Sequence, residues 1–219
     1  MERLPGSDLG LVYRSLSIAA KGGLAARMVD IQRRVASLPA GRGFGYGQRE
    51  DDPRLLPTWP AALDQHLDRS RGRMRAVGLV DAAIVDRVAA RLNTHAAALA
   101  KVPPVCFLHD TTTKNVLVHR GQLSGIVDVD NVCYGDPLRT VALTRMSLLA
   151  SDDDTDYTEA WTAALDLAPA GLRLLDSYTA MYGVDFLSEL GQRFNRDAPL
   201  AASAARAQQL IAIVDRLLA

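Results

Sequence analysis

The feature that most constrains the fold of this chain is a pair of short β-prone runs with polar residues at their ends. Val116–Val118 and Leu123–Val127 are rich in strand-forming residues, and the four residues between them, 119–122, include a glycine that can adopt a positive φ. This pattern predicts a β-hairpin. The apolar run 105–108 just upstream predicts a buried strand or extended segment that leads into the loop before the hairpin.

Three oxygen-bearing side chains accompany the predicted hairpin. Asn115 lies five residues after Asp110, and Asp128 lies thirteen residues after Asn115. Because paired strands lie about 4.7 Å apart, the second strand should carry Asp128 to the same end of the hairpin as Asn115. Magnesium prefers oxygen ligands, and a carboxylate can orient an attacking hydroxyl. The spacing therefore predicts a phosphoryl-transfer site, with Asp110 beside the hydroxyl and the other two holding magnesium on ATP.

The pattern resembles the aminoglycoside phosphotransferase and choline kinase-like family of the protein-kinase-like superfamily. That family carries an H-G-D-x-x-x-x-N loop, a hairpin, a hydrophobic-I-D segment and then G-D-P. Here Asp110 and Asn115 keep the loop spacing, Asp128 ends the hydrophobic segment, and Gly135-Asp136-Pro137 takes the last place. The resemblance implies transfer of the γ-phosphate of ATP to a hydroxyl of a small molecule. It also implies that Asp110 is the base and that Asn115 and Asp128 are Mg²⁺ ligands.

Other residues near the motif have supporting roles or ordinary structural ones. The family's histidine stands two residues before the aspartate, whereas His109 is adjacent to Asp110, so it is either a loop support or a packed imidazole. Asp136 followed by proline is a good helix start in any protein, and the resemblance adds a role in bracing the catalytic loop. Asp130, Asn131 and Lys114 are candidate neighbours of substrate or metal, or ordinary polar loop residues.

The resemblance extends over most of the chain and implies an α+β, mostly helical fold: a protein-kinase-like C-lobe with a small catalytic β-hairpin. We expect one unit, 1–219, made of a hinge-like start and helical subdomain (1–101), the catalytic loop, hairpin and following helix (102–150), and C-terminal helices (151–219). The N-terminal β lobe of such kinases, with its glycine-rich flap and strand lysine, is expected to be absent. Gly41–Gly47 is glycine-rich but follows a helical pattern, which favours a flexible surface loop over a phosphate flap.

Helical periodicity and capping residues predict the remaining elements. Ser7 can cap a first short helix, and Met28, Ile31 and Val35 form an apolar stripe on the next. The predicted helices cover a short segment after Ser7 and then 24–38, 58–77, 81–102, 136–149, 157–167, 171–190 and 199–218.

Composition narrows the class of protein. The formal net charge is zero, which argues against nucleic-acid binding because a basic excess usually attracts the phosphate backbone. The sequence has no apolar run of about 18 residues and no signal peptide at Met1, so we expect a cytoplasmic protein without a membrane partner. Cys106 and Cys133 lack CxxC spacing and are expected to be inert thiols.

Two charge clusters leave alternatives open. Arg69, Arg71, Arg73 and Arg75 alternate at spacing two, which spreads them around a helix and favours a solvated surface. The acidic group comprises Asp152, Asp153, Asp154 and Asp156. It favours capping of the following helix, and the alternative is an acidic rim that attracts a cationic substrate.

Two functions remain. The first is an ATP-dependent phosphotransferase acting on a small-molecule hydroxyl, in a truncated form with weak or no activity alone. A separate chain or a missing segment could then supply the N-lobe. The second is a non-catalytic module derived from such a kinase that binds a metabolite or a partner.

Overall fold

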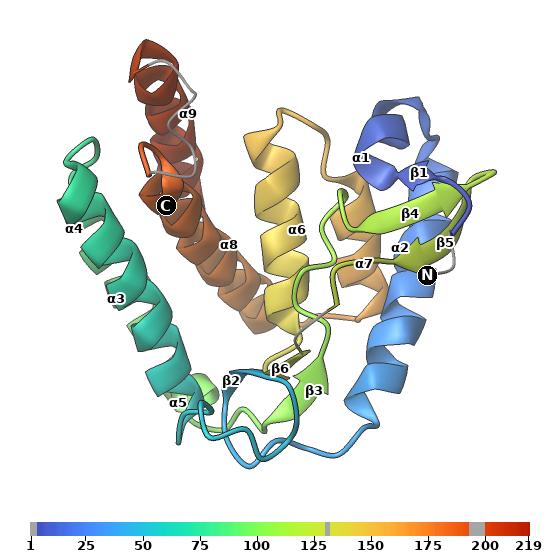
Figure 1. Ribbon diagram of the computed structural model, residues 1–219, viewed down its shortest axis with the longest axis horizontal. Helices are drawn as coiled ribbons and strands as arrows, with labels where there is room; N and C mark the ends of the chain where they lie inside the picture. Colours follow the sequence, from blue (N-terminus) through green and yellow to red (C-terminus); the bar gives the residue numbers. More distant parts are fainter. Residues whose placement is uncertain (1–3, 130–131, 193–199) are drawn as a thin grey trace.

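Two small antiparallel sheets lie at the edges of a larger set of helices (Figure 1), in a computed structural model that describes residues 4–129, 132–192 and 200–219. Its strands are β1 (Ser7–Asp8), β2 (Gly45–Gly47), β3 (Val105–Phe107), β4 (Val116–His119), β5 (Gln122–Ile126) and β6 (Val132–Gly135). Its helices are α1 (Leu9–Val12), the short 3-10 turn η1 (Tyr13–Ser15), α2 (Ile18–Ala36), α3 (Trp59–Val77), α4 (Ala83–Asn93), α5 (Ala96–Leu99), α6 (Leu138–Ala150), α7 (Asp156–Ala164), α8 (Pro169–Glu189) and α9 (Leu200–Leu218). The predicted α+β, mostly helical class is confirmed.

The predicted hairpin forms from β4 and β5, with Val116 opposite Ile126 and His119 opposite Gln122. Arg120 and Gly121 make the turn with φ values of 52° and 77°. Two consecutive positive φ values are the geometry that suits the twist of a two-residue hairpin, and glycine adopts one of them without steric cost. A third strand, β1, pairs with the other edge of β4. The hairpin prediction is confirmed, and the sequence pattern did not reveal the added strand.

The second sheet has the strand order β2-β6-β3 and corrects one prediction. Gly45–Gly47 was expected to belong to a flexible loop, but it is a strand whose central residue, Tyr46, pairs with Cys133. Gly41 lies so close to the Tyr134 ring that an added Cβ would be 2.6 Å from its Cγ. The glycines therefore permit close backbone approach, which a sequence pattern cannot distinguish from loop flexibility.

The boundaries of α3 follow its sequence. Thr58 has an extended backbone, and its hydroxyl accepts a hydrogen bond of 3.2 Å from the Ala61 amide. Pro60 stands in the first turn, where its missing N–H has no partner to lose. Both signals were visible in the sequence, and the predicted helix is confirmed.

The predicted helix from Asp81 is two helices, α4 and the short α5. The Asp81 carboxylate accepts a 2.9 Å hydrogen bond from the Ala83 amide at the start of α4. Ile84, Val88 and Leu92 are all buried, so the spacing of four identified the core-facing side of this helix.

Helices α6 and α8 form the centre of the molecule, where α6 packs against α7, α8 and α9. Polar side chains inside these helices find local partners: the Thr179 hydroxyl donates to the Leu175 carbonyl at 2.8 Å, and the Ser177 hydroxyl to that of Arg173 at 2.9 Å. Because both helices bury residues all around their circumference, their hydrophobic periodicity is weak.

The first helices depart from expectation. Ser7 lies in β1 and is exposed, so it does not cap a helix. Helix α2 begins at Ile18, where the Ser17 hydroxyl accepts from the Ala20 amide at 3.2 Å, six residues before the predicted start. Ile31 and Val35 are only half-buried, and Gln32 faces the interior beside Met28. The apolar stripe was therefore misplaced because a buried glutamine occupies part of the inner face.

The acidic residues before α7 act mainly as partners of the N-terminal segment. Lys21 of α2 is buried, and its Nζ lies 2.6 Å from Asp154 Oδ2 and 3.6 Å from Asp156 Oδ2. Arg14 Nε lies 2.5 Å from Asp153 Oδ1. The Asp154 carboxylate also accepts from the Asp156 amide, which is the predicted capping role. These ion pairs connect the acidic segment before α7, and the first residue of α7, to η1 and α2, so three of the four carboxylates have structural partners.

The arginines of α3 divide between two sides of the helix. Arg69 and Arg73 lie near Asp185 of α8, at 3.3 and 3.8 Å, whereas Arg71 pairs with Asp68 and Asp86. The prediction that they spread around the helix is confirmed, although three of the four make ion pairs and are not simply solvated.

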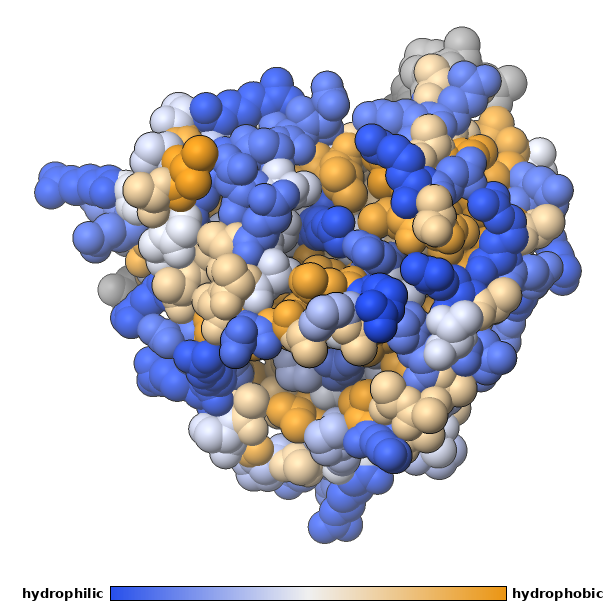
Figure 2. Space-filling view, turned by 180° about the vertical axis from the view of Figure 1, so that it is seen from behind, coloured by the Kyte–Doolittle hydropathy of each residue, from blue (hydrophilic) through white to orange (hydrophobic). Residues whose placement is uncertain are grey.

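Hydrophilic side chains cover most of the face seen in Figure 2, and hydrophobic ones show chiefly in hollows between them. Among the described residues, none of the helices is both long enough and apolar enough to cross a membrane.

Candidate active site

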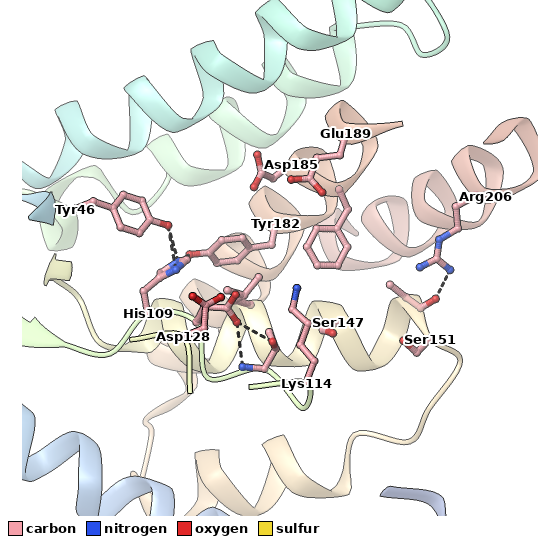
Figure 3. A pocket seen from close by; sticks show the side chains of 15 residues that line it. Tyr46, His109, Lys114, Asp128, Ser147, Ser151, Tyr182, Asp185, Glu189 and Arg206 are labelled. Atoms are coloured by element: carbon pink, nitrogen blue, oxygen red, sulfur yellow. Dashed lines mark hydrogen bonds between the residues drawn. The ribbon is translucent and has the colours of Figure 1, made fainter. Parts of the chain in front are cut away.

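A pocket of about 560 Å³ lies between the catalytic loop, α6 and α8. The loop contributes Asp110 and Lys114, and Asp128 enters from the end of β5. In Figure 3, Lys114 and Asp128 lie on one side of this pocket and Asp185 and Glu189 of α8 lie on the other. The folded chain thus brings two of the three predicted oxygen-bearing residues to one cavity.

Asp110 is held by the residue two positions after it. Its Oδ1 accepts hydrogen bonds from the Thr112 amide at 3.2 Å and from the Thr112 hydroxyl at 2.7 Å. Among the described residues, no hydrogen bond is made to its Oδ2. A carboxylate that is oriented through one oxygen and open at the other can accept a proton from a molecule in the pocket.

Asn115 lies beneath the loop and does not line the pocket. It is buried, and its Nδ2 donates to the Asp110 carbonyl at 3.2 Å, which leaves Oδ1 as its free ligand atom. Its own carbonyl accepts from the Val127 amide at 2.9 Å, which extends the strand pairing beyond the hairpin. This bond places Asp128 beside Asn115 at one end of the hairpin, as the sequence predicted.

The backbone at Asp128 is in an unusual conformation, with φ at 58° in the left-handed region. Aspartate visits this region more readily than most residues, but the conformation still costs on the order of 1 kcal/mol. The side chain is exposed to the pocket. Such strain is typical of functional positions, and here it directs a carboxylate toward the cavity.

The catalytic loop is braced by α2 and α6. The Gln32 side chain donates from Nε2 to the Leu108 carbonyl at 2.8 Å and accepts from the Leu108 amide at 3.1 Å. The Thr140 hydroxyl of α6 donates to the same carbonyl at 2.7 Å, and the Thr144 hydroxyl donates to the Thr111 carbonyl at 3.3 Å. These side chains satisfy backbone groups that a buried loop would otherwise leave without partners.

Asp136 starts α6, and its side-chain hydrogen bonds within the described residues are made to that helix and to α8. Its Oδ1 accepts from the Leu138 amide at 3.0 Å, and its Oδ2 accepts from the Tyr178 hydroxyl at 3.1 Å. Burial raises the pKa of this carboxyl above its usual value. Any effect of Asp136 on the catalytic loop is therefore indirect, through the position of α6.

His109 is buried between two tyrosines. Its Nε2 lies 2.5 Å from the Tyr182 hydroxyl, and the Tyr46 hydroxyl lies 3.0 Å from its Nδ1. Burial, and to a smaller extent repulsion from Arg139, lowers the pKa of His109 well below 6.5. The ring is therefore neutral. The packed-imidazole alternative matches this geometry, and the hydrogen-bond partners of the ring are the two tyrosines that line the pocket with it.

The neutral histidines predict how stability changes with pH. Burial lowers the pKa of His66 as well as that of His109 below the usual 6.5. Below that value the unfolded chain binds protons that the folded one does not, so the free energy of unfolding should fall as pH decreases from about 6.5. Each histidine should contribute about 1.4 kcal/mol per pH unit. Urea unfolding between about pH 5 and 7 measures how the free energy of unfolding depends on pH. His109→Gln should reduce this slope by about 1.4 kcal/mol per pH unit, the contribution of one proton. An unchanged slope would contradict the assignment of His109 as a buried, neutral imidazole.

Several residues that line the pocket were not predicted from the sequence. Tyr182, Asp185 and Glu189 stand at i, i+3 and i+7 on α8, which is one helix face. That spacing was readable, but polar residues on one helix face are ordinary until the fold shows what they face. Tyr46 reaches the pocket from β2, and Arg206 from α9, where its guanidinium contacts the Ala150 carbonyl and Gln209.

The pocket has an acidic balance. Of the described residues that line it, four are acidic and two are basic: Asp110, Asp128, Asp185 and Glu189 against Lys114 and Arg206. Burial and the neighbouring Asp185 raise the pKa of Glu189. Lys114 makes no hydrogen bond or ion pair within the described part of the chain, so its amine is open to a ligand in the pocket. Asp130 and Asn131, the other predicted neighbours, lie outside the described residues.

The two cysteines lie on adjacent strands, Cys106 on β3 and Cys133 on β6, and both are buried free thiols. Burial raises the pKa of Cys133 to about 11 and also raises that of Cys106. Protonated thiols are poor nucleophiles and poor metal ligands, which fits the expectation that they are inert.

Comparison with known proteins first defines the class. Several solved aminoglycoside phosphotransferases have a similar fold: APH(4)-Ia in a complex with AMP-PNP and hygromycin B matches with a TM-score of 0.62 and 20% identity, over 98% of this chain and 70% of that one. ADP-bound APH(2'')-Ib matches with a TM-score of 0.61 and 15% identity over 100% and 69% of the two chains. The gentamicin complex of APH(2'')-IIa matches at 0.64 and 13% over 99% and 69%. At these identities the matches establish a shared kinase-like fold.

The model of the phosphotransferase enzyme family matches residues 1–175. The chain therefore belongs to this family, as the motif indicated. No curated protein sequence matches it.

Proposed function

We propose that this chain carries the catalytic lobe of a phosphotransferase that transfers the γ-phosphate of ATP to a hydroxyl of a small molecule. The observation that carries the proposal is the meeting of Asp110, Lys114 and Asp128 at one pocket on the open end of the hairpin. The solved relatives with AMP-PNP or ADP support a nucleotide as the donor. The reaction would take place in the cytoplasm, where ATP is available.

Asp110 has the geometry of the base. As the substrate oxygen attacks the γ-phosphorus, its proton passes to the free Oδ2 of Asp110, the bond to the β-phosphate oxygen breaks, and ADP leaves. The hydrogen bonds from Thr112 keep the carboxylate from rotating away from the hydroxyl. Alignment of this kind supplies much of the catalysis in phosphoryl transfer, because the protein does little covalent chemistry.

The donor set suits magnesium. Asp128 offers a carboxylate at the pocket, and Asn115 offers the Oδ1 atom that its loop hydrogen bond leaves free. These are hard oxygen ligands of the kind that Mg²⁺ accepts together with water and phosphate oxygens. The ion would neutralise charge on the phosphates, and Lys114 would add a second positive charge next to them. His109 and Asp136 would hold the surrounding walls in place.

The acidic side of the pocket favours a substrate with positive charge. Asp185 and Glu189 face Asp110 and Asp128 across the cavity, and the similar solved structures include complexes with hygromycin B and with gentamicin. An aminosugar or amino alcohol with a free hydroxyl fits this balance of charges. The cation-attracting surface that the sequence suggested near Asp152 is thus better supplied by α8.

We also propose that turnover by this chain alone is weak. The similar structures are longer, and about 30% of their length has no counterpart here. In kinases of this type, a glycine-rich flap and a strand lysine grip the phosphates. A partner chain or a further segment would supply this second half of the nucleotide clamp.

The magnesium role is tested by nucleotide binding, which does not require turnover. Calorimetry with AMP-PNP should detect binding that depends on Mg²⁺ and is abolished by EDTA. Asp128→Ala should weaken it about tenfold or more, because a metal anchor is lost. Asp64→Ala, which removes an exposed carboxylate from α3, is the matched control and should have no effect. Magnesium-dependent binding that survives Asp128→Ala would refute the assignment.

A further inference from the structure

A second cavity, of about 350 Å³, lies between α3 and β2, behind the wall of the active-site pocket. Tyr46 lines both cavities. Three arginines line the second one, Arg54, Arg69 and Arg139, and no aspartate or glutamate of the described chain does. We call it the arginine-lined cavity. Its charge is opposite to that of the acidic pocket next to it.

Arg139 is the main evidence for a ligand. Its side chain is almost fully buried, at 1% exposure, and it forms no ion pair with any carboxylate in the described part of the chain. Its Nε donates to the Tyr182 hydroxyl at 2.8 Å, and its Nη2 lies 3.4 Å from His66 Nδ1. A guanidinium has five N–H groups and stays charged, so these contacts leave N–H donors unused and leave the buried charge without an ion-pair partner in the described part of the chain.

The aromatic neighbours compensate this charge only in part. The Arg139 guanidinium lies 5.4 Å from the Trp59 ring and 5.3 Å from the Tyr182 ring. Contacts of this kind are individually weak and offset only part of the cost of burying an ion. An anion bound in the cavity would compensate the rest of the Arg139 charge.

His66 lines the same cavity. Its Nδ1 faces Arg69 Nη2 at 3.1 Å as well as Arg139, so it accepts hydrogen bonds and the proton must be on Nε2. That Nε2 is buried and has no hydrogen-bond partner within the described residues. The nearest carboxylate oxygen, Asp185 Oδ1, is 3.8 Å away and belongs to the acidic pocket.

The other two arginines of the cavity, Arg54 and Arg69, each already form an ion pair with a carboxylate. Arg54 binds Asp52 through Nε at 2.9 Å and Nη2 at 2.7 Å, and Arg69 Nη2 lies 3.3 Å from Asp185 Oδ1. Neither of these carboxylates lines the cavity. The paired arginines still contribute N–H donors and positive potential around Arg139.

We propose that the arginine-lined cavity binds a small oxyanion, a phosphate or carboxylate group, on Arg139 with help from Arg69 and His66. Planar guanidinium groups match both anions in geometry and bind them through charge-assisted hydrogen bonds. The volume is within the range of ligand pockets, so the anionic group can belong to a larger metabolite. This site is separate from the pocket assigned to phosphoryl transfer and does not depend on that function.

The test is calorimetric titration of the full chain, without nucleotide or magnesium, with inorganic phosphate and separately with acetate. Chloride buffer should hold the ionic strength constant, because surface charges respond to salt. The key variant is Gln65→Glu, which adds a carboxylate at an exposed residue of the cavity wall and leaves the core intact. Gln208→Glu on α9 is the matched control, since it makes the same change at an exposed helical position elsewhere.

We expect saturable 1:1 binding of at least one of the two anions, and the one that binds more tightly identifies the group. Gln65→Glu and Arg69→Gln should each weaken binding about tenfold or more. Arg75→Gln removes the same charge from an exposed position on α3 and should leave binding unchanged. Lys114→Gln should also leave it unchanged, because that lysine lines the other pocket.

Three results would overturn the proposal. One is the absence of saturable binding of either anion to the unmodified chain. Another is binding that Gln65→Glu does not weaken. The third is binding that Lys114→Gln abolishes, since the ion would then occupy the phosphoryl-transfer pocket.

Discussion

Asp110→Asn should lower kcat for phosphate transfer about 10²- to 10⁴-fold, the usual contribution of a general base. The variant keeps the size of the side chain and can still contact Thr112, but its amide cannot take the proton of the substrate hydroxyl. Single-turnover transfer from ATP to an amino-alcohol or aminosugar acceptor, with protein in excess, measures the loss even where turnover is slow. Binding of AMP-PNP should stay unchanged, because Asp110 acts on the acceptor.

Thr112→Val provides the graded comparison. It removes the 2.7 Å hydroxyl contact to Asp110 and keeps the amide contact, so the base is present but less well oriented. The rate should fall about tenfold, which corresponds to one modest hydrogen bond. If Asp110→Asn instead retains about a tenth or more of the rate, the carboxylate is not the base and acts at most in positioning.

Gly135→Ala should lower the free energy of unfolding by about 3 kcal/mol or more. Gly135 has φ at 146°, and a Cβ added there would lie 2.1 Å from Trp59 Cζ3. The Trp59 indole cannot move easily, because it is buried and its Nε1 donates to the Tyr178 hydroxyl at 2.7 Å. Urea denaturation, followed by circular dichroism, measures the change.

Gly72→Ala is the matched control for this substitution. Gly72 lies inside α3, and a Cβ added there would have nothing within 4 Å. The same chemical change should therefore stabilise the protein, by about 0.5–1 kcal/mol, because alanine favours the helix. Equal effects of the two substitutions would mean that the contact between Gly135 and Trp59 does not constrain the fold.

The helix start in the Gly135-Asp136-Pro137 motif could be predicted from the sequence, but the need for glycine at position 135 could not. The sequence indicated that Gly135-Asp136-Pro137 starts a helix, and Asp136 does accept from the Leu138 amide. It could not indicate that a tryptophan distant in sequence fills the space next to the glycine. Capping is a local interaction over two or three residues, whereas this contact depends on how α3 packs against β6 and α8.

Likewise, one side of the candidate active site could be predicted from the sequence and the other could not. Asp110, Asn115 and Asp128 are connected by a short hairpin, so their proximity follows from a two-residue turn and strand spacing. The opposite wall comes from α8, which is about 60 residues further along the chain, and its orientation depends on packing against α6 and α3. Asp185 and Glu189 could not be assigned to the site until that packing was known.

Local sequence by itself determined the hairpin, the starts of α3 and α4, and the loop that carries the proposed base, because strand pairing across a tight turn and helix capping act over a few residues. Only the tertiary structure decided that Gly45–Gly47 is a strand, that Asp154 pairs with Lys21, and that Arg139 is buried with no ion pair to a carboxylate of the described residues. Those features arise from contacts between segments far apart in the chain. The free energy of such contacts depends on burial and on the partner, and neither is present in a local pattern.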